Sequence, residues 1–581
     1  MTTLRLALAQ INLTVGDITG NLAKTRESLA RARVEQAHII LLPELTVAGY
    51  PPEDLLLKPD FVAANWTALQ SLLPDTKGIT AIVGFVHRQD DLFNAAAVLH
   101  NGQLAGIYHK SLLPNYSVFD EDRYFAPGDN DILFELPLPD GQQVCFGVSV
   151  CEDIWYPVSP PAAQAAAGAE LLLNISASPY QSGKIQGRDR MLATRATDNV
   201  AVVAYCNLVG GQDELVFDGS SVVVDERGGL LARGHSFAED FLVVDVDITN
   251  VFRQRLRDPR RRKGNLGKNY ADKFERIKLT PIEPAPTPAP RPPDPPRPSL
   301  DSLAEVYQAL VLGTRDYVHK NGFRQVTMGL SGGVDSSLVA AIAADALGPE
   351  NVTGVIMPSR FSSDHSKNDA IELAERLGIR YEVVAIEAAH QAYLGMLADQ
   401  FAGTEPGIAE ENLQSRARGN VLMALSNKFG WLVLTTGNKS EMAVGYATIY
   451  GDMAGGFAVI KDVPKTLVYR LCRYRNEKIG YAIPESVLTK PPSAELRPDQ
   501  KDTDSLPEYD VLDKILTVYI EADYSLAEIV ALGFDEATVR RIIGMVDRSE
   551  YKRRQAPPGP KITSKSFGKD RRLPITNRYR A

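Results

Sequence analysis

The sequence has few cysteines and no long apolar run, and both absences narrow the class of protein. Four cysteines in 581 residues cannot make a disulfide scaffold, and their spacing matches no zinc-binding pattern. No apolar stretch of about 18 residues occurs, which argues against a transmembrane helix. The first residues also lack the pattern of a secretion signal, and a net charge of −9 argues against a general nucleic-acid binder. We therefore expect a reduced, cytoplasmic protein with neither a membrane nor a nucleic-acid partner.

Prolines are concentrated in one segment of the chain. Residues 281–298 contain ten prolines in eighteen positions. Proline fixes φ and lacks the backbone donor that helices and sheets need, so such a segment forms an extended spacer. We expect a first domain at 1–275, a proline-rich linker at 276–299 and a second domain at 300–581.

The first half alternates short apolar runs with helical stretches. Runs rich in valine, isoleucine and leucine are typical of buried strands. They lie at 4–11, 38–44, 79–85, 94–100, 144–150, 170–176, 200–206 and 220–225. Helical patterns at 20–36 and 160–168 lie between some of them. This arrangement predicts a layered α/β domain with two sheets.

The second half shows a more regular alternation of strands and helices. Expected strands lie at 325–330, 352–358, 381–386 and 431–437, and expected helices at 300–320, 338–347, 364–378 and 411–428. Alternation of this kind predicts a parallel, doubly wound sheet.

A glycine-serine loop, GLSGGVDSS at 329–337, joins the first strand of the second half to its helix. Gly332 and Gly333 let the backbone approach an anion, and the helix N-terminus presents free N–H groups to it. Hydroxyl donors are added by Ser331, Ser336 and Ser337. Asp335 would repel a phosphate unless Mg²⁺ bridges the two. The pattern is neither a Walker A motif nor the GxGxxG dinucleotide fingerprint.

This loop resembles the PP-loop of the ATP pyrophosphatase superfamily, whose members cleave ATP between its α and β phosphates and adenylate a substrate. The resemblance implies a Rossmann-like, doubly wound fold for the second domain. It also implies that ATP is bound by the whole loop, namely Gly329, Leu330, Ser331, Gly332, Gly333, Val334, Asp335 and Ser336.

Later segments resemble the NAD synthetases within that superfamily. They are ENLQSRARGN at 411–420, TTGNKSE at 435–441, KDVPKT at 461–466, KPPSAEL at 490–496 and KDRRLPIT at 569–576. The resemblance implies ATP contacts from Thr436, Lys465 and Ser493, and deamido-NAD contacts from Asn412, Arg416 and Glu441. It makes Asp335 and Glu441 the ligands of Mg²⁺. Short, ammonia-using relatives carry a lysine and an aspartate where this chain has Ile449 and Gly456.

The C-terminal stretch 548–581 is strongly basic, with eleven lysines or arginines against two acidic residues. A solvated tail, a nucleic-acid arm or a segment that closes over the substrates could have this composition. We favour the third because its glycines and prolines provide turn chemistry. On that interpretation Lys561, Lys565 and Lys569 are candidates to contact the phosphates of deamido-NAD.

Three separated segments of the first half carry a glutamate, a lysine and a cysteine. Glu44 lies in LLPELTVAGYPPED, Lys110 in YHKSLLPNY and Cys151 in VSVCEDIWYP. A free thiol has a pKa of about 8.5 and needs activation to attack an amide. Glu44 would take the thiol proton and later protonate the leaving ammonia, while Lys110 would stabilise the thiolate and the oxyanion. The alternative is a cysteine–histidine pair, but His109 would point to the opposite face of a strand from Lys110.

Together these segments resemble the nitrilase, or carbon–nitrogen hydrolase, superfamily, which uses a glutamate–lysine–cysteine triad. The resemblance covers about 1–275 and implies a four-layer αββα sandwich. It makes Glu121 the accessory glutamate that orients the lysine, with Asp120 and Asp122 as alternatives. It also places Tyr116, Ser178 and Lys184 where glutamine-using members bind glutamine, and Lys184 would pair with the α-carboxylate.

A cysteine amidase and an adenylating domain in one chain are suited to a single reaction. The pair resembles the glutamine-dependent NAD synthetases, which implies a C–N ligase with Mg²⁺ as cofactor and ATP as co-substrate. The expected partners are the small molecules glutamine, ATP and deamido-NAD, and we expect a homo-oligomer. Two alternatives stay open: another PP-loop amidotransferase such as a GMP synthetase, and an amidohydrolase whose second half senses ATP.

Overall fold

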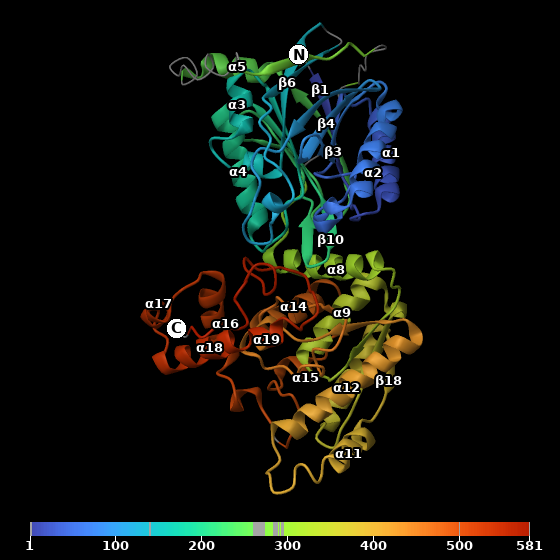
Figure 1. Cartoon of the computed structure of the whole chain (residues 1–581), viewed down its shortest axis with the longest axis vertical. Coiled ribbons are helices and arrows are strands. Elements are labelled where there is room, and N and C mark those ends of the chain that lie inside the picture. The colour runs from blue at the N-terminus through green and yellow to red at the C-terminus, as the bar shows by residue number, and fades with distance from the viewer. Residues whose placement is uncertain are drawn as a thin grey trace. The chain divides into compact units, whose positions relative to one another are not determined.

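The computed structural model describes residues 3–138, 141–259, 273–282, 289, 291, 296–498 and 500–579. The chain divides into two compact units, Met1–Gln212 with Phe217–Leu300 and Asp213–Val216 with Asp301–Ala581. Figure 1 shows the first unit mainly in blue to green and the second in yellow to red. Part of the proline-rich linker expected at 276–299 lies outside the described residues.

The first unit contains two mixed sheets. One has the strand order β14-β1-β2-β3-β4-β5. Its strands are β1 Thr3–Gln10, β2 Ile39–Leu41, β3 Thr80–Arg88, β4 Leu92–His100, β5 Gln103–His109 and β14 Asp240–Asp247. β1 pairs in parallel with β2 and antiparallel with β14, so a strand from the end of the unit completes the sheet edge beside the first strand.

The second sheet of this unit has the order β13-β12-β9-β8-β7-β6-β15. Its strands are β6 Ile132–Pro137, β7 Gln143–Val150, β8 Leu171–Ser176, β9 Val202–Asn207, β12 Val222–Val224, β13 Leu230–Arg233 and β15 Glu275–Lys278. A separate two-stranded sheet pairs β10 Val209–Gln212 with β11 Leu215–Asp218. The domain boundary expected after residue 275 falls inside β15, which pairs in parallel with β6.

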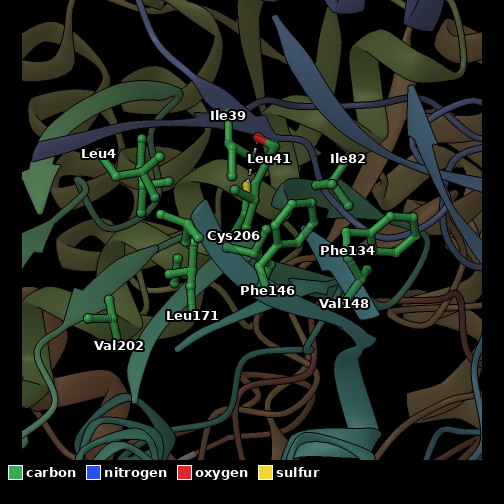
Figure 2. Close-up of a cluster of buried hydrophobic side chains, with 14 of the residues drawn as sticks. Leu4, Ile39, Leu41, Ile82, Phe134, Phe146, Val148, Leu171, Val202 and Cys206 are labelled. Carbon is green, nitrogen blue, oxygen red and sulfur yellow. Dashed lines mark hydrogen bonds between the residues drawn. The ribbon is translucent and has the colours of Figure 1, made fainter. Parts of the chain in front are cut away.

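Apolar side chains pack the two sheets face to face. Figure 2 shows the centre of this core, where residues of the first sheet meet residues of the second: Leu4, Ile39, Leu41, Ile82, Phe134, Phe146, Val148, Leu171, Val202 and Cys206. Alternate residues of β1 point into the core because successive side chains of a strand face opposite sides. Burying each large apolar side chain contributes about 1.5–3 kcal/mol, so this interface is the main source of stability in the unit.

Helices cover the outer faces of the two sheets (Figure 1). One side carries α1 Ile18–Val34 and α2 Pro59–Ser71, and the other carries α3 Pro160–Ala166 and α4 Lys184–Asn199, with α5 Thr249–Arg257 farther along the chain. A second apolar cluster includes Ala165 of α3, Leu192 of α4 and Val203 of β9. The layers therefore run helix, sheet, sheet, helix, which confirms the expected four-layer sandwich.

The second unit is built on one parallel sheet with the order β18-β17-β16-β19-β20. Its strands are β16 Val326–Gly329, β17 Val352–Ile356, β18 Arg380–Val383, β19 Leu432–Thr435 and β20 Phe457–Ala458. The chain runs from β16 to β17 and β18 on one side and then returns to β19 on the other. β16 and β19 therefore flank the switch point, where open α/β sheets bind their ligands.

The helices of the second unit confirm the expected alternation and extend beyond it. They are α8 Ser302–Lys320, α9 Val334–Leu347, α10 Asp364–Leu377, α11 Glu387–Met396, α12 Ile408–Phe429, α13 Lys439–Val444, α14 Lys465–Lys478, α15 Glu485–Thr489, α16 Tyr509–Leu516, α17 Leu526–Ala531, α18 Glu536–Arg548 and α19 Glu550–Arg553. A separate apolar cluster joins α16, α17 and α18 through residues such as Leu512, Ile529 and Ile542. Across the described ranges, no helix combines the length and apolar character that crossing a bilayer requires.

Candidate active sites

Glu44 and Lys110 form a buried ion pair in the first unit. Glu44 lies just after β2 and Lys110 directly after β5. Lys110 Nζ is 2.8 Å from Glu44 Oε1, and neither side chain is exposed. Asn94 Nδ2 also donates to Glu44 Oε1 at 2.7 Å, and the backbone N–H of Ala177 donates to Glu44 Oε2 at 2.8 Å. Both carboxylate oxygens are thus held in place by neighbouring donors.

Glu121 is the second carboxylate on Lys110. Its Oε1 and Oε2 accept hydrogen bonds from Lys110 Nζ at 2.9 and 2.8 Å, and the Tyr50 hydroxyl donates to Oε1 at 2.8 Å. Burial raises the pKa of Glu121 to about 7 even though Lys110 opposes the rise. Burial disfavours the charged form of Lys110, but Glu121 and Glu44 together hold its pKa well above the usual value. Lys110 is therefore a permanently charged ammonium clamped between two glutamates.

Cys151 begins a short 3-10 turn, Cys151–Ile154, directly after β7. Its φ is +42°, in the left-handed region that non-glycine residues rarely occupy. Asp153 holds the turn by accepting hydrogen bonds from the backbone N–H groups of Val150 and Leu112, both at 2.9 Å. Such a strained residue at a strand end is a common position for a nucleophile.

The charges on the glutamate–lysine pair act directly on the Cys151 thiol. Burial raises the pKa of Cys151 most, and the negative charge of Glu44 raises it further. Lys110 and a hydrogen bond from Ser176 oppose the rise. The structure thus brings together the three residues that the sequence places in separate segments.

Two of the three candidate glutamine-binding residues, Tyr116 and Lys184, interact with the carboxylate of Glu152, the residue after Cys151. The Tyr116 hydroxyl donates to the Glu152 carboxylate at 2.9 and 3.1 Å. Burial raises the pKa of Glu152, and the Tyr116 hydrogen bond and the positive charges of Lys110 and Lys184 oppose the rise. Lys184 Nζ also donates to Pro179 O at 2.8 Å. Ser178 is buried, and its N–H donates to Asn207 Oδ1 at 3.0 Å. Sequence reasoning missed Glu152, although its place beside Cys151 was a usable signal.

His109 does not join this cluster. Its Nε2 is 2.7 Å from Nδ1 of His87, and its ring stacks on Phe93 with centroids 4.1 Å apart. Lys110, the next residue, turns instead toward Glu44 and Glu121. The geometry therefore favours a lysine–glutamate arrangement over a cysteine–histidine pair.

The phosphate loop of the second unit runs from the end of β16 into α9. Gly332 has φ +73°, and a Cβ added there would lie 2.0 Å from Ser366 O, so only glycine suits the position. Ser331 Oγ lies 3.1 Å from Ser336 Oγ and accepts from the Gly333 N–H at 3.2 Å. Gly329 is the last residue of β16, Leu330 N donates to Val355 O at 2.9 Å, and Val334 begins α9. The loop is thus tightly held at its base and leads directly into a helix N-terminus.

Asp335, Glu441 and Lys465 meet at the carboxyl ends of β16 and β19. Lys465 Nζ is 2.5 Å from Asp335 Oδ2 and 3.2 Å from Glu441 Oε1, and Asn438 Nδ2 donates to Asp335 Oδ1 at 3.0 Å. Burial raises the pKa of Glu441 to about 8, Lys465 opposes the rise, and Asp335 adds to it. Burial works against the charge on Lys465, but Asp335 and Glu441 raise its pKa. The three residues form one compact charge cluster beside the loop.

The other candidate nucleotide contacts lie on neighbouring segments. Thr436 is half-buried immediately after β19, and exposed Ser493 accepts from the Glu495 N–H at 3.1 Å. On α12, Asn412 Oδ1 accepts from the Thr448 hydroxyl at 2.9 Å, and the exposed Arg416 donates from Nε to Ile449 O at 3.3 Å. Asn412 and Arg416 therefore both contact the segment in which this chain carries Ile449.

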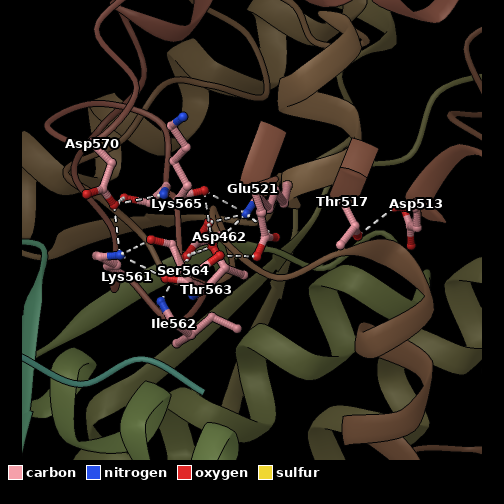
Figure 3. A network of polar contacts seen from close by, with 12 residues as sticks. Asp462, Asp513, Thr517, Glu521, Lys561, Ile562, Thr563, Ser564, Lys565 and Asp570 are labelled. Atoms are coloured by element: carbon pink, nitrogen blue, oxygen red, sulfur yellow. Dashed lines mark hydrogen bonds and ion pairs between the residues drawn. The ribbon is translucent and has the colours of Figure 1, made fainter. Parts of the chain in front are cut away.

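The three C-terminal lysines differ in their surroundings. Lys561 is buried, and its Nζ contacts Asp570 at 2.8 Å and the carbonyl oxygens of Thr563 and Ser564 (Figure 3). Lys565 pairs with Asp523 at 2.6 Å near the surface, and Lys569 is half-exposed. The ammonium of Lys561 is thus already bound inside the protein, whereas Lys565 and Lys569 are accessible to solvent.

A buried lysine that sequence reasoning missed anchors this C-terminal segment. Lys439 Nζ lies 3.0 Å from Asp462, 3.0 Å from Glu521 and 2.6 Å from Thr563 Oγ1. Asp462 in turn accepts from the N–H groups of Ile562 and Thr563, both at 2.8 Å (Figure 3). Because Lys439 lies in the TTGNKSE segment, the motif that supplies Glu441 also ties down the C-terminal stretch.

Comparison with known proteins decides the family. Residues 5–255 match the carbon-nitrogen hydrolase family and residues 306–556 match the NAD synthase family. A glutamine-dependent NAD(+) synthetase of Thermotoga maritima is 49% identical over the full length of both chains. The chain belongs to the glutamine-dependent NAD(+) synthetases. A further member from Aquifex aeolicus is also 49% identical, over 99% of this chain and 100% of that protein.

Solved structures agree with this membership. A glutamine-dependent NAD+ synthetase from Acinetobacter baumannii, in complex with adenosine diphosphate, is 40% identical with a TM-score of 0.74, over 99% of this chain and 98% of that chain. A glutamine-dependent NAD(+) synthetase from Cytophaga hutchinsonii has the same fold, with a TM-score of 0.79 at 21% identity over the same shares of the two chains. These comparisons support neither the GMP synthetase nor the ATP-sensing amidohydrolase alternative.

Proposed function

We propose that the protein transfers nitrogen from glutamine to deamido-NAD and that ATP drives the transfer. Deamido-NAD, ATP, glutamine and water give NAD, AMP, pyrophosphate and glutamate. The observation that carries this proposal is the presence, in one chain, of the buried Glu44–Lys110–Cys151 cluster and of a phosphate loop with Asp335 beside Lys465. An amide-cleaving centre and an adenylating centre are the two activities that such a transfer needs, and membership in the family supports the pairing.

In the first half-reaction we assign Cys151 as the nucleophile. Its thiol proton passes to Glu44 as the sulfur attacks the amide carbon of glutamine. Lys110 stabilises the oxyanion, and Glu44 then donates the proton to the departing ammonia. Water attacks the thioester carbon, glutamate leaves, and the sulfur regains a proton. Glu121 acts on Lys110 and keeps its ammonium in position.

Glutamine presents an amide at one end and an α-ammonium and an α-carboxylate at the other. We propose that Lys184 binds the α-carboxylate and that Glu152, held by Tyr116, complements the α-ammonium. Ser178 would contact the substrate from the segment whose neighbour, Ala177, holds Glu44. A positive and a negative side chain near the cysteine suit an amino acid better than a simple amide.

In the second half-reaction the loop from Gly329 to Ser336 binds the phosphates of ATP, with Thr436, Lys465 and Ser493 as further contacts. Asp335 and Glu441 are two converging carboxylates, and Mg²⁺ is usually held by one or two carboxylates together with substrate phosphates, so they suit this ion. Bound Mg²⁺ would offset the phosphate charge. Lys465 already lies between the two carboxylates and would shift its ammonium toward the phosphates.

For deamido-NAD we propose contacts from Asn412, Arg416 and Glu441, with Lys561, Lys565 and Lys569 as phosphate contacts. Exposed Arg416 suits a phosphate because its guanidinium offers several donors in a fixed plane. Lys565 would exchange Asp523 for a phosphate, whereas Lys561 would have to leave a buried pair with Asp570. Ammonia then attacks the adenylated carboxyl carbon of deamido-NAD, and AMP is released.

We further propose that the protein works in the cytoplasm as a homo-oligomer. Four free cysteines are compatible with a reducing compartment. Light scattering of the purified protein would give the oligomeric state, and cell fractionation would give the location.

The proposed function is tested by supplying either glutamine or ammonia to a Cys151→Ala variant. We expect glutamine-dependent NAD formation to fall by about a thousandfold or more, because the loss of a covalent nucleophile removes the pathway, while ammonia-dependent formation persists. Cys145→Ala, on the strand β7 that Cys151 directly follows, is the matched control. A folded Cys151→Ala variant that ammonia also failed to rescue would contradict the two-site scheme. Replacing deamido-NAD with xanthosine monophosphate tests the acceptor in the same assay.

A further inference from the structure

A line of buried polar side chains leads to Cys151 from the second sheet. Ser176 ends β8, and Tyr205 lies on the neighbouring strand β9. Neither residue is exposed, and Ser176 Oγ is 2.7 Å from the Tyr205 hydroxyl. The next residue, Ala177, donates its N–H to Glu44. The end of β8 therefore contacts Glu44 and, by the register of β7 with β8, lies beside Cys151, the other member of the proposed proton-transfer pair.

The direction of the hydrogen bonds follows from the number of protons. Val150 pairs with Ile175 in the parallel register of β7 and β8, so Cys151 and Ser176, the next residue of each segment, lie beside each other. From this position the Ser176 hydroxyl lowers the pKa of the Cys151 thiol, as a hydrogen bond to the sulfur does. A thiolate has no proton to give, so the Ser176 hydroxyl must be the donor. A serine hydroxyl carries a single hydrogen, and therefore Tyr205 must be the donor in its bond with Ser176.

The position of Arg188 favours Tyr205 as the donor in its hydrogen bond with Ser176. Its guanidinium lies 5.5 Å from the centre of the Tyr205 ring, and both residues are fully buried. Burial disfavours ionisation of Tyr205, whereas the positive charge of Arg188 opposes that effect and makes the phenol a better donor. Arg188 is fixed by two hydrogen bonds to the carboxylate of Asp218. The cation is thus held in place without reaching the sulfur itself.

We propose that Ser176 is a catalytic residue that stabilises the Cys151 thiolate, and that Tyr205 is a positioning residue acting through it. The inference rests on the proposed role of Cys151 as nucleophile. Ser176 keeps its proton throughout, since Glu44 receives the proton of the thiol. The bond to sulfur is strong when the sulfur is charged and weak in the neutral thioester, so it also helps the thiolate to leave during hydrolysis.

Other charged and titratable groups also act on this thiol. They are Glu44, Lys110, Glu152, Tyr50, Tyr116 and Tyr205. Glu44 and Lys110 take part in the proposed reaction itself, so their removal would change more than the thiol. Ser176 is neutral at every working pH, and its removal therefore changes only a hydrogen bond.

The test measures how fast iodoacetamide alkylates Cys151 as a function of pH, with the modified peptide identified by mass spectrometry in the full-length protein. In Ser176→Ala we expect the apparent pKa of the thiol to rise by about one unit, which slows alkylation about tenfold at a fixed lower pH. Tyr205→Phe should shift the profile in the same direction by less. Ser149→Ala is the matched control, because Ser149 is a buried serine on β7 whose hydroxyl bonds Leu173 O and Asn174.

The outcomes separate this inference from the proposed function. The melting temperature of each variant, measured by thermal denaturation, reports whether it is folded, because ammonia-dependent NAD formation tests only the second unit. An unchanged alkylation profile in folded Ser176→Ala overturns the role of Ser176, even if Cys151→Ala still abolishes glutamine use. Full glutamine use by Cys151→Ala would instead overturn the proposed function. If Ser176→Ala does not fold, Tyr205→Phe decides: a raised apparent pKa supports the relay, and an unchanged profile overturns it.

Discussion

Lys465 Nζ lies 2.5 Å from Asp335 Oδ2, so the buried ammonium forms an ion pair with the carboxylate of the phosphate loop. Glu441 completes the group at 3.2 Å from the same nitrogen. Two carboxylates this close would repel each other in a buried site if nothing compensated them. Lys465 supplies that compensation.

Lys465→Met should stop NAD formation with either nitrogen source while glutamate release from glutamine persists. Removing a charge that stabilises the transition state typically lowers kcat by 10²–10³, and Asp335 and Glu441 would also lose their compensating charge. The measurement compares AMP formation and glutaminase activity in the same variant. Lys478→Met, an exposed residue of the same helix, is the control. A Lys465→Met enzyme with full ammonia-dependent activity would contradict the assigned role.

Glu121→Gln should remove an acidic limb from the pH profile of glutamine hydrolysis. Burial raises the pKa of Glu121 from 4.5 to about 7, so the carboxyl gains a proton as the pH falls through about 7. Lys110 then loses one of its two negative partners, and we expect the rate of glutamate release to decline below that pH. The variant should be slower but should lack this limb.

The raised pKa of Glu121 changes the free energy of unfolding in the opposite direction with pH. Loss of folding therefore cannot cause the decline in rate below about pH 7. A carboxyl whose folded pKa is raised contributes stability that is present below its unfolded pKa, near 4.5, and lost as the pH rises through about 7. Thermal denaturation at pH 6 and pH 8 checks this sign. If Glu121→Gln kept the wild-type acidic limb, another group would be responsible for it.

Gly332→Ala should impair ATP-dependent amidation selectively. The residue has φ +73°, and the new Cβ would lie 2.0 Å from Ser366 O, a backbone atom that cannot rotate away. The left-handed conformation alone costs about 1–2 kcal/mol with a side chain, and a shift of the loop by about 1 Å can cost a hundredfold in rate. Steady-state kinetics with ammonia would measure this loss.

The matched control for Gly332→Ala is Gly544→Ala. Gly544 lies within α18, where a Cβ meets only Arg548 Nη2 at 3.7 Å. We expect that variant to keep its activity and to gain slightly in stability, since alanine is the better helix former. Equal losses in both variants would show that the loop is not specially constrained.

Lys561→Met distinguishes a structural from a substrate-binding lysine. The change removes the ammonium from a buried ion pair with Asp570, which keeps its hydrogen bonds from Ser566, and breaking a buried ion pair typically costs about 3–5 kcal/mol. Lys565→Met removes a pair whose partner, Asp523, is 71% exposed, and should cost at most about 1 kcal/mol. Thermal denaturation and the KM for deamido-NAD are measured together. A raised KM with an unchanged melting temperature in Lys561→Met would favour direct substrate contact instead.

Sequence patterns predicted most of the interior strands and missed several at sheet edges, although the exposed edge strand β18 was expected and the interior strand β6 was not. The runs that became β1, β8 and β9 are almost wholly apolar, and all were expected. β13 and β15 were not, because Leu230–Arg233 and Glu275–Lys278 mix charged with apolar residues. An edge strand has one neighbour and partial solvent contact, so its composition overlaps with that of loops. Its pairing depends on a distant segment, as β15 with β6 shows.

The residues of the candidate sites also differ in whether the sequence alone could identify them. Glu44, Lys110, Cys151 and the glycine-serine loop were identifiable because chemistry requires those residue types within short, characteristic strings. The surroundings of Lys561 were not, because Asp570 and the carbonyls of Thr563 and Ser564 reach it only after the segment turns back on itself. Ser176 likewise looked like an ordinary strand residue until β9 brought Tyr205 beside it.

The amino-acid sequence by itself determined the order of the two halves, the alternation of strands and helices, and the reactive groups available to each half, since these depend on local composition and spacing. Only the tertiary structure decided which of those groups meet. Contacts such as Lys110 with Glu44 join residues 66 positions apart, and the close packing of the sheets, rather than any local preference, sets which side chains share a buried, low-dielectric space.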